Sequence, residues 1–427
     1  MELTGVEAVM FDLVVVFALA GTVAAFAAIS IRIPYTIALV IVGLAVSLLG
    51  VELQSGLTTE LLSDLILDVL VPALLFQGAT RVNADRFFEN VWPILALAVV
   101  GLPLSIGLLG AAGTVGLGVP LLVSLLFGAI VLPTDPVAVL PLFEELGAPE
   151  RLTVLVDGES MLNDGVAVVL YTGFIEIVLQ AQATGESTGF GLRPTAVAAE
   201  LATEAAMAIV GGVLVGASTG YVVYRAIRAF DDELTTVLLS FVLAYGAFLL
   251  GESLGFGGVI AVVSAGLFIA ERREDSPLNA ETRLTFRITW QSVAFIGNTF
   301  LFLAIGLVTP FGTLLSEAIP IAVAIALVFL ARAVVVYPLM GLLNRTPVEP
   351  VPRAYQHVLV WGGIHVSIPL ALALGLPAAF PDALAAQFQV LAFGIATFTL
   401  IVQGLTMAPL LHRLGVTTVT EAGDFGR

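Results

Sequence analysis

The chain has 427 residues, of which 59% are hydrophobic and only 11% are charged, and its mean hydropathy is +1.07. A soluble domain of this size needs more polar side chains to cover its surface, since about 45–50% apolar residues is usual. The composition therefore excludes a soluble globule and indicates a polytopic membrane protein. The absence of cysteine excludes disulfides and thiolate chemistry.

The charge balance is acidic, with 33 Asp and Glu against 16 basic residues, all of them Arg, and a net charge of −17. This balance excludes a basic nucleic-acid surface, so no nucleic-acid partner is expected. The missing lysine has two explanations, a GC-rich genome or a halophile with acidic protein surfaces, and we favour the halophile. The acidic N-terminal segment lacks the basic start of a signal peptide, so we expect the first apolar run to be retained.

Apolar runs of about 20 residues predict an all-α protein of thirteen transmembrane helices without a soluble domain. The predicted spans are 8–30, 34–50, 61–79, 89–112, 120–145, 151–180, 197–226, 234–250, 255–271, 286–308, 318–342, 356–375 and 385–411. With these spans, 14 of the 16 arginines fall on one side of the membrane; the exceptions are Arg193 and Arg332. The positive-inside rule then predicts a cell-membrane protein with the N-terminus outside and the C-terminus in the cytoplasm.

The fifth span contains Pro133, Pro136 and Pro141 around Thr134 and Asp135. Proline lacks a backbone N–H and disrupts the preceding turn, so we expect the helix to break at Thr134 and Asp135. Broken backbone at membrane depth lines a cavity or is buried in protein, and its free carbonyls can bind ions. Asp135 is expected to compensate the exposed N–H groups of the second half-helix.

The sixth span places Glu159, Ser160, Asn163 and Asp164 within six residues. Ser160, Asn163 and Asp164 share one face of a helix, because they lie three and four residues apart. Hydroxyl, amide and carboxylate oxygens suit a monovalent cation, and Asp164 has no obvious basic partner. Asp157, near the start of the span, is expected to be a solvated interfacial acid.

Arg332 is the only arginine in the interior of a predicted span rather than at its end, so it needs a buried acidic partner. We predict that this partner is Glu159 and that the pair fixes spans six and eleven against each other. This pairing leaves Asp164 as the one carboxylate without a counter-charge.

The twelfth span has the sequence WGGIHVSIPLALAL (361–374), with two glycines and Pro369. It is a second candidate for a broken helix, and two such interruptions in matching positions indicate an inverted-repeat transporter. His365, within this segment, could relay protons or sense pH, but we favour a structural hydrogen bond. We read Asn298, in span ten, as a structural or interfacial residue.

TDPVAV (134–139), ESMLNDG (159–165), Arg332 and WGG (361–363), in this order, resemble the NhaP/NHE-type cation:proton antiporters over essentially the whole chain. The resemblance implies an inverted-repeat homodimer in which spans five and twelve are discontinuous and cross. It also implies a core domain around 89–180 and 318–411 and a dimerisation domain around 8–79 and 197–308. These regions form a single exchanger domain over 1–427.

The resemblance also implies residue roles. Asp164 resembles the family's ion- and proton-binding Asp, and Asn163 the Asn before it. The other implied cation ligands are Thr134, Ser160 and Glu159, with Asp135 at the half-helix ends and Glu159–Arg332 as the stabilising ion pair. His365 and Val366 depart from the family's pattern, in which a hydrophobic residue and then Arg-Gly follow WGG, so His365 is a candidate for pH modulation.

Together these features predict a secondary Na⁺/H⁺ antiporter, not an enzyme, that needs no cofactor and exchanges one Na⁺ for one H⁺ at Asp164. Oxygen ligands leave a K⁺/H⁺ or unselective antiporter, and Li⁺ as a substrate, open. A Na⁺-coupled organic-anion symporter is a weaker alternative because the predicted ligand set is compact. An intramembrane protease is disfavoured because a GxGD motif is absent and Ser160 has no evident oxyanion loop.

Overall fold

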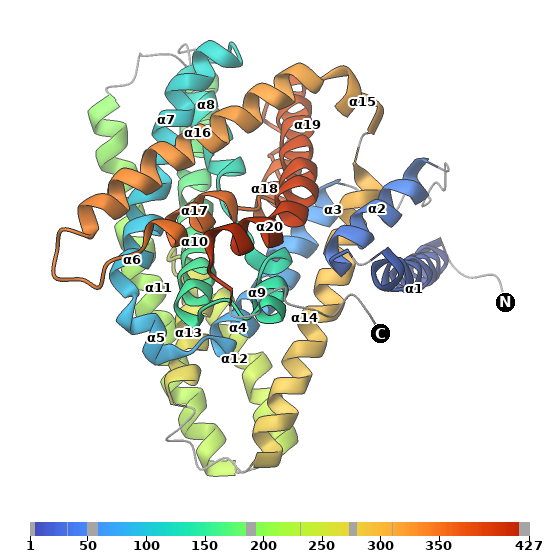
Figure 1. The fold of residues 1–427 in the computed structure, drawn as a ribbon, viewed down its shortest axis with the longest axis vertical. Helices are drawn as coiled ribbons and strands as arrows, with labels where there is room; N and C mark the ends of the chain where they lie inside the picture. The colour runs from blue at the N-terminus through green and yellow to red at the C-terminus, as the bar shows by residue number, and fades with distance from the viewer. Residues whose placement is uncertain are drawn as a thin grey trace.

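The computed structural model describes residues 5–31, 33–48, 59–184, 194–230, 232–272, 280–309 and 311–417. Within these ranges the chain is helical and contains no strand. The helices pack as one bundle, and the ends of α11, α12, α13 and α14 project together at the bottom of Figure 1. The structure therefore confirms the predicted all-α class.

Short connections join most consecutive helices. They are α1 (Gly5–Ile31), α2 (Tyr35–Leu48), α3 (Thr59–Asp64), α4 (Val71–Arg81), α5 (Ala84–Glu89), α6 (Val91–Leu95), α7 (Leu102–Gly116), α8 (Leu121–Val131), α9 (Leu140–Leu146), α10 (Glu150–Thr184), α11 (Pro194–Phe230), α12 (Glu233–Ser253), α13 (Gly258–Glu271), α14 (Ala280–Val308), α15 (Phe311–Ser316), α16 (Ala318–Leu343), α17 (Arg353–Trp361), α18 (Ser367–Leu374), α19 (Asp382–Phe398) and α20 (Gly404–Leu414). Short π-helical turns continue three of them: η1 (Leu65–Leu70), η2 (Ala96–Gly101) and η4 (Thr399–Gln403).

Nine helical stretches in the described ranges are long and apolar enough to cross a membrane. Three shorter apolar helices (Phe17–Ser30, Tyr35–Leu48 and Gly258–Glu271) coincide with further predicted spans. The predicted twelfth span is divided between α17 and α18, each too short to cross alone. A multi-pass membrane protein is thus confirmed, while the count of thirteen remains a prediction.

Two helices are interrupted where prolines or glycines predict it. After α8 the chain leaves helical conformation until the single turn η3 (Pro136–Ala138), and α9 follows. The second interruption, 362–366, separates α17 from α18. The two breaks lie against each other: the Asp135 N–H donates to the Ile364 carbonyl at 2.6 Å, and His365 Nδ1 donates to the Pro133 carbonyl at 2.8 Å. Backbone groups freed by one break are therefore satisfied by the other.

Close packing of α2 against α14 depends on two glycines. A Cβ atom on Gly43 of α2 would lie 2.5 Å from the Leu303 carbonyl oxygen, and one on Gly306 of α14 would lie 2.4 Å from that of Val40. Small residues of this kind let helix backbones approach closely in membranes. The contact holds α2 against the end of α14.

Candidate functional site

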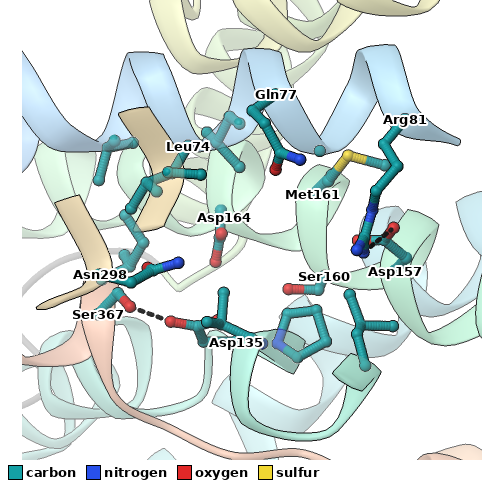
Figure 2. Close-up of a pocket in the computed structure, with 18 of the residues that line it drawn as sticks. Leu74, Gln77, Arg81, Asp135, Asp157, Ser160, Met161, Asp164, Asn298 and Ser367 are labelled. Atoms are coloured by element: carbon teal, nitrogen blue, oxygen red, sulfur yellow. Dashed lines mark hydrogen bonds and ion pairs between the residues drawn. The ribbon is translucent and has the colours of Figure 1, made fainter. Parts of the chain in front are cut away.

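The long helix α10 presents polar side chains to a cavity of about 240 Å³. Asp157, Ser160, Met161 and Asp164 line it, and their spacing of three and four residues places them on one face of the helix. The other walls come from α4 and α14, and the first helix break, α9 and the start of α18 complete the lining (Figure 2). The cavity thus lies where segments from both halves of the chain meet.

Asp164 is buried, with 7% of its surface exposed, and projects into this cavity (Figure 2). Its Oδ1 has no hydrogen-bond partner among the described residues. Buried polar atoms are rarely left unpaired, because losing water without a replacement is costly. A carboxylate in this state needs either a proton or a cation.

Asp135 faces the same cavity from the first break, and both of its carboxylate oxygens accept hydrogen bonds from the protein. Its Oδ1 accepts a hydrogen bond from the Val137 N–H at 2.9 Å, and its Oδ2 accepts one from the Ser367 hydroxyl at the start of α18. The structure thus places Asp135 at the ends of two half-helices, where a negative charge is favourable.

A buried hydrogen-bond network joins the first break to α10. The Ser160 hydroxyl donates to the Thr134 carbonyl, and Asn163 Nδ2 donates to Thr134 Oγ1 at 2.8 Å and to Glu159 Oε1 at 3.1 Å. The Thr134 N–H points back to Asn163 Oδ1 at 3.4 Å. Asn163 therefore holds the broken segment in register with the helix that carries Asp164.

Glu159 and Arg332, which the sequence pairs, lie in contact. Arg332 Nη1 and Nη2 donate to the two carboxylate oxygens of Glu159 at 3.1 and 2.8 Å, and Arg332 Nε donates to the Leu359 carbonyl at 2.9 Å. A Cβ on Gly363 would lie 2.7 Å from Arg332 Nε, which explains a glycine here. Glu159 lines a separate small pocket with Arg332 rather than the Asp164 cavity, and Asn163 links it to Thr134, which does not line that cavity either.

His365 is buried beside the breaks, and its hydrogen bonds join it to other parts of the fold rather than to the ion cavity. Its backbone N–H donates to Thr399 Oγ1 at 3.2 Å, and its ring nitrogen Nδ1 donates to the Pro133 carbonyl. His365 does not line the cavity around Asp164. The structure thus places it as a link between the two interruptions.

Three features of the cavity were not found from the sequence. Asn298 of α14 lines it, and its Oδ1 is buried without a partner among the described residues. Ser367 of α18 bonds to Asp135. Asp157 is buried rather than solvated, with one oxygen 3.7 Å from Arg81 Nη2, so our expectation of an interfacial acid was wrong. No local pattern reveals these contacts, because each joins segments far apart in the chain.

The donor set fits a monovalent cation better than a divalent one. No group of three or more His, Asp or Glu side chains in the described part of the chain is arranged to hold a metal ion. Tight sites for divalent hard cations usually use several carboxylates. The cavity instead combines one free carboxylate with hydroxyl and amide oxygens.

Comparison with known proteins gives a consistent result over most of the chain. Residues 14–413 match the family described as "Sodium/hydrogen exchanger, transmembrane". The Na(+)/H(+) antiporter ApNhaP of Aphanothece halophytica is 35% identical over 388 residues, which cover 90% of this chain and 70% of that protein. The Na(+)/H(+) antiporter NhaH of Halobacillus aidingensis is 31% identical over 419 residues, covering 96% and 99%.

The fold has a solved counterpart. The structure of the sodium proton antiporter MjNhaP1 from Methanocaldococcus jannaschii superposes with a TM-score of 0.74 at 19% identity, covering 97% of this chain and 99% of that one. This family consists of transporters, so the prediction that the chain is not an enzyme is confirmed. Sequence and fold together show that the chain belongs to the transmembrane sodium/hydrogen exchanger family.

Proposed function

We propose that the chain exchanges Na⁺ for H⁺ across a cell membrane, with both ions competing for Asp164. The observation that carries this proposal is the buried Asp164 oxygen that lacks a partner. A carboxylate that holds a proton or a cation, but not both, couples the two fluxes. The printed names of the relatives, Na(+)/H(+) antiporters, support the choice of ions.

We assign the cation ligands from the groups that reach or border the cavity. Asp164 supplies the charge and Ser160 a hydroxyl oxygen from the cavity lining. Thr134 does not line the cavity, and we assign it through its backbone carbonyl, which accepts the hydrogen bond of the Ser160 hydroxyl. Asn298 of α14 adds an amide oxygen, because its Oδ1 is buried and unpaired in the same cavity. Glu159 is assigned to the support of Arg332, since both of its oxygens already accept hydrogen bonds from that guanidinium.

Exchange proceeds by alternating access in this proposal. The core domain, around 89–180 and 318–411, moves against the dimerisation domain, around 8–79 and 197–308, within a homodimer. Asp164 is neutral when occupied by either ion, so the site can cross the membrane, whereas the empty charged site carries a penalty of about 2.5–3.5 kcal/mol and stalls. Because Asn163 is uncharged, one Na⁺ exchanges for one H⁺ and the cycle is electroneutral.

The cavity volume disfavours the symport of an organic anion. Its 240 Å³ lies below the range of about 300–1,000 Å³ that is usual for small-molecule pockets. A single cation with a few waters fits this space. Parallel Na⁺, Li⁺ and K⁺ titrations of the exchange rate determine which cation is preferred, and we expect Na⁺.

The decisive variant is Asp164→Asn, which keeps the side-chain shape and removes the exchangeable charge. In proteoliposomes with an imposed pH gradient, we expect this variant to lose coupled Na⁺/H⁺ exchange. Asp85→Asn, an exposed acid on α5, is the matched control and should retain it. Coupled exchange by Asp164→Asn at the wild-type rate would overturn the proposal.

A further inference from the structure

Two cavities border α10 on either side of Asp164. The α10 residues that line the ion cavity end at Asp164, and those from Gly165 to Glu176 line a pocket of about 330 Å³, here called the opposite pocket. Between the two cavities α10 packs tightly against α13, since a Cβ atom on Gly165 would lie 2.5 Å from Cγ1 of the buried Ile260. The structure thus holds Asp164 open to the ion cavity and closed toward the opposite pocket.

Arg81, the last residue of α4, lines the ion cavity, and its helix is fixed to α13 and α14. A Cβ atom on Gly266 of α13 would lie 2.6 Å from the Ala79 Cβ atom. The ring centroid of Phe76 lies 4.7 Å from that of Trp290 on α14. In the proposed domain division, Arg81 therefore projects from the dimerisation domain.

Both ion-pair partners of Arg81 belong to the proposed core domain. Arg81 Nη1 lies 3.2 Å from Glu144 Oε1 on α9, and Nη2 lies 3.7 Å from Asp157 Oδ2 on α10. Figure 2 shows the contact with Asp157 at the edge of the ion cavity. One guanidinium thus joins the two proposed domains beside the ion site.

The contact with Asp157 contributes more to this link than the contact with Glu144. The Asp157 side chain is 8% exposed, whereas that of Glu144 is 67% exposed. Exposed ion pairs contribute little because water screens them, but a buried acid that loses its counter-charge is strongly unfavourable. Arg81 is the only ion-pair partner of Asp157 among the described residues, so movement of α10 away from α4 is opposed.

We propose that Arg81, Asp157 and Glu144 are positioning residues that form a latch between the domains and keep Asp164 open on the side of Arg81. The inference rests on the proposed alternating access, because the latch must open whenever Asp164 turns toward the opposite pocket. The apparent affinity of a site scales with the population of the state that can bind. In Arg81→Gln the apparent KM for Na⁺ on the side of the opposite pocket should therefore fall, by about threefold.

A purely electrostatic role for Arg81 makes a different prediction. Loss of a positive charge beside the ion cavity would raise the local cation concentration and lower the KM for Na⁺ on the side of Arg81 itself. Arg81→Gln and Asp157→Asn would then act in opposite directions, because one removes a positive and the other a negative charge. A latch predicts the same direction for both variants, since each breaks the same ion pair.

Alkylation of a single cysteine measures the orientation of the site without any transport. The chain contains no cysteine, so Val259→Cys, at a buried position that lines the opposite pocket, provides a unique reporter. Its rate of reaction with a water-soluble maleimide is measured on the purified protein in detergent. Ser124→Cys, buried on α8 against Gly113 of α7, is a second reporter that responds only to general loosening of the fold.

Four substitutions are compared in each reporter background: Arg81→Gln, Asp157→Asn, the conservative Arg81→Lys, and the control Arg86→Gln. Arg86 is exposed and pairs with Glu89 and Glu150, both in the proposed core. The control therefore removes the same charge as Arg81→Gln without breaking a contact between the domains.

We expect Val259→Cys to react about threefold faster in Arg81→Gln and in Asp157→Asn, and at the reference rate in Arg86→Gln and, within about twofold, in Arg81→Lys. An unchanged rate in Arg81→Gln, opposite changes in Arg81→Gln and Asp157→Asn, or equal acceleration of Ser124→Cys would overturn the latch. If exchange proves independent of Asp164, the proposed function fails, while the alkylation rates still decide the latch.

Discussion

Asp164 and Asn298 face the same cavity from different helices, and each has a buried oxygen without a partner in the described structure. Figure 2 shows the two side chains on neighbouring walls, α10 and α14. In the proposed domain division, α10 belongs to the moving core and α14 to the dimerisation domain. A ligand from the stationary domain would be available on one side of the membrane only, which would give the site different cation affinities on the two sides.

This arrangement predicts the effect of Asn298→Ala. Removing one polar group that contacts a charged species costs about 1.5–3 kcal/mol. The apparent KM for Na⁺ should therefore rise about tenfold or more on one side of the membrane, with little change in the maximal rate. The measurement is Na⁺-dependent exchange in vesicles of known protein orientation. Ser292→Ala, an exposed position on the same helix, should leave KM unchanged. An unaltered KM in Asn298→Ala would remove Asn298 from the ligand set.

Local patterns in the sequence indicate some of these residues and not others. Two prolines around Asp135 predict a break, and the structure places Asp135 where its carboxylate receives the Val137 N–H of the next turn. Asn298 lies in an apolar helix with no distinguishing neighbours. Its place opposite Asp164 depends on how α10 and α14 pack, which one sequence does not reveal.

At the scale of helices, the Glu159–Arg332 pair joins α10 to α16, and Arg332 also bonds to the Leu359 carbonyl of α17. Removing one partner of a buried pair leaves the other charge uncompensated, which costs about 3–5 kcal/mol. We expect Glu159→Gln to lower the melting temperature markedly and the double variant Glu159→Gln/Arg332→Met to recover part of the loss. A double variant less stable than the sum of its single changes would contradict a compensating pair.

The approach of α2 to α14 gives a second prediction for helix packing. Gly43→Val should separate the helices, because even a Cβ atom there would lie 2.5 Å from the Leu303 carbonyl oxygen. Overpacking of this kind costs about 1–3 kcal/mol, so we expect a lower melting temperature in detergent. Gly246→Val on α12 is the matched control, since no atom lies within 4 Å of its Cβ position. Equal melting temperatures for the two variants would contradict the close packing.

Composition predicts where a helix lies in the chain more reliably than it predicts the residues at which the helix begins and ends. The run predicted at 286–308 begins at Ala280, six residues earlier, because polar residues such as Glu281 and Arg283 extend α14 beyond its apolar part. Hydropathy identifies only the part of a helix that matches the bilayer core. The breaks were predictable because proline and glycine act locally, whereas their hydrogen bonds to each other required the fold.

At the scale of the whole molecule, Asp164 is the one acid of the ion cavity without a hydrogen-bond or ion-pair partner among the described residues, since Asp157 is paired with Arg81, and this predicts electroneutral exchange. Asn163 is uncharged, Glu159 is paired with Arg332, and both Asp135 oxygens accept hydrogen bonds. An imposed membrane potential should therefore leave the rate of Na⁺/H⁺ exchange unchanged in proteoliposomes. A rate that rises or falls steadily with the potential would contradict one-for-one exchange.

The most direct measurement is the release of protons when Na⁺ binds to the purified, detergent-solubilised protein. In weakly buffered solution with a pH-sensitive dye, we expect wild-type protein to release up to one proton for each Na⁺ bound, near the pH at which Asp164 is half protonated. Asp164→Asn should release none, and Asp85→Asn should match the wild type. Na⁺ binding without proton release, or release that persists in Asp164→Asn, would contradict the claim that the two ions share Asp164.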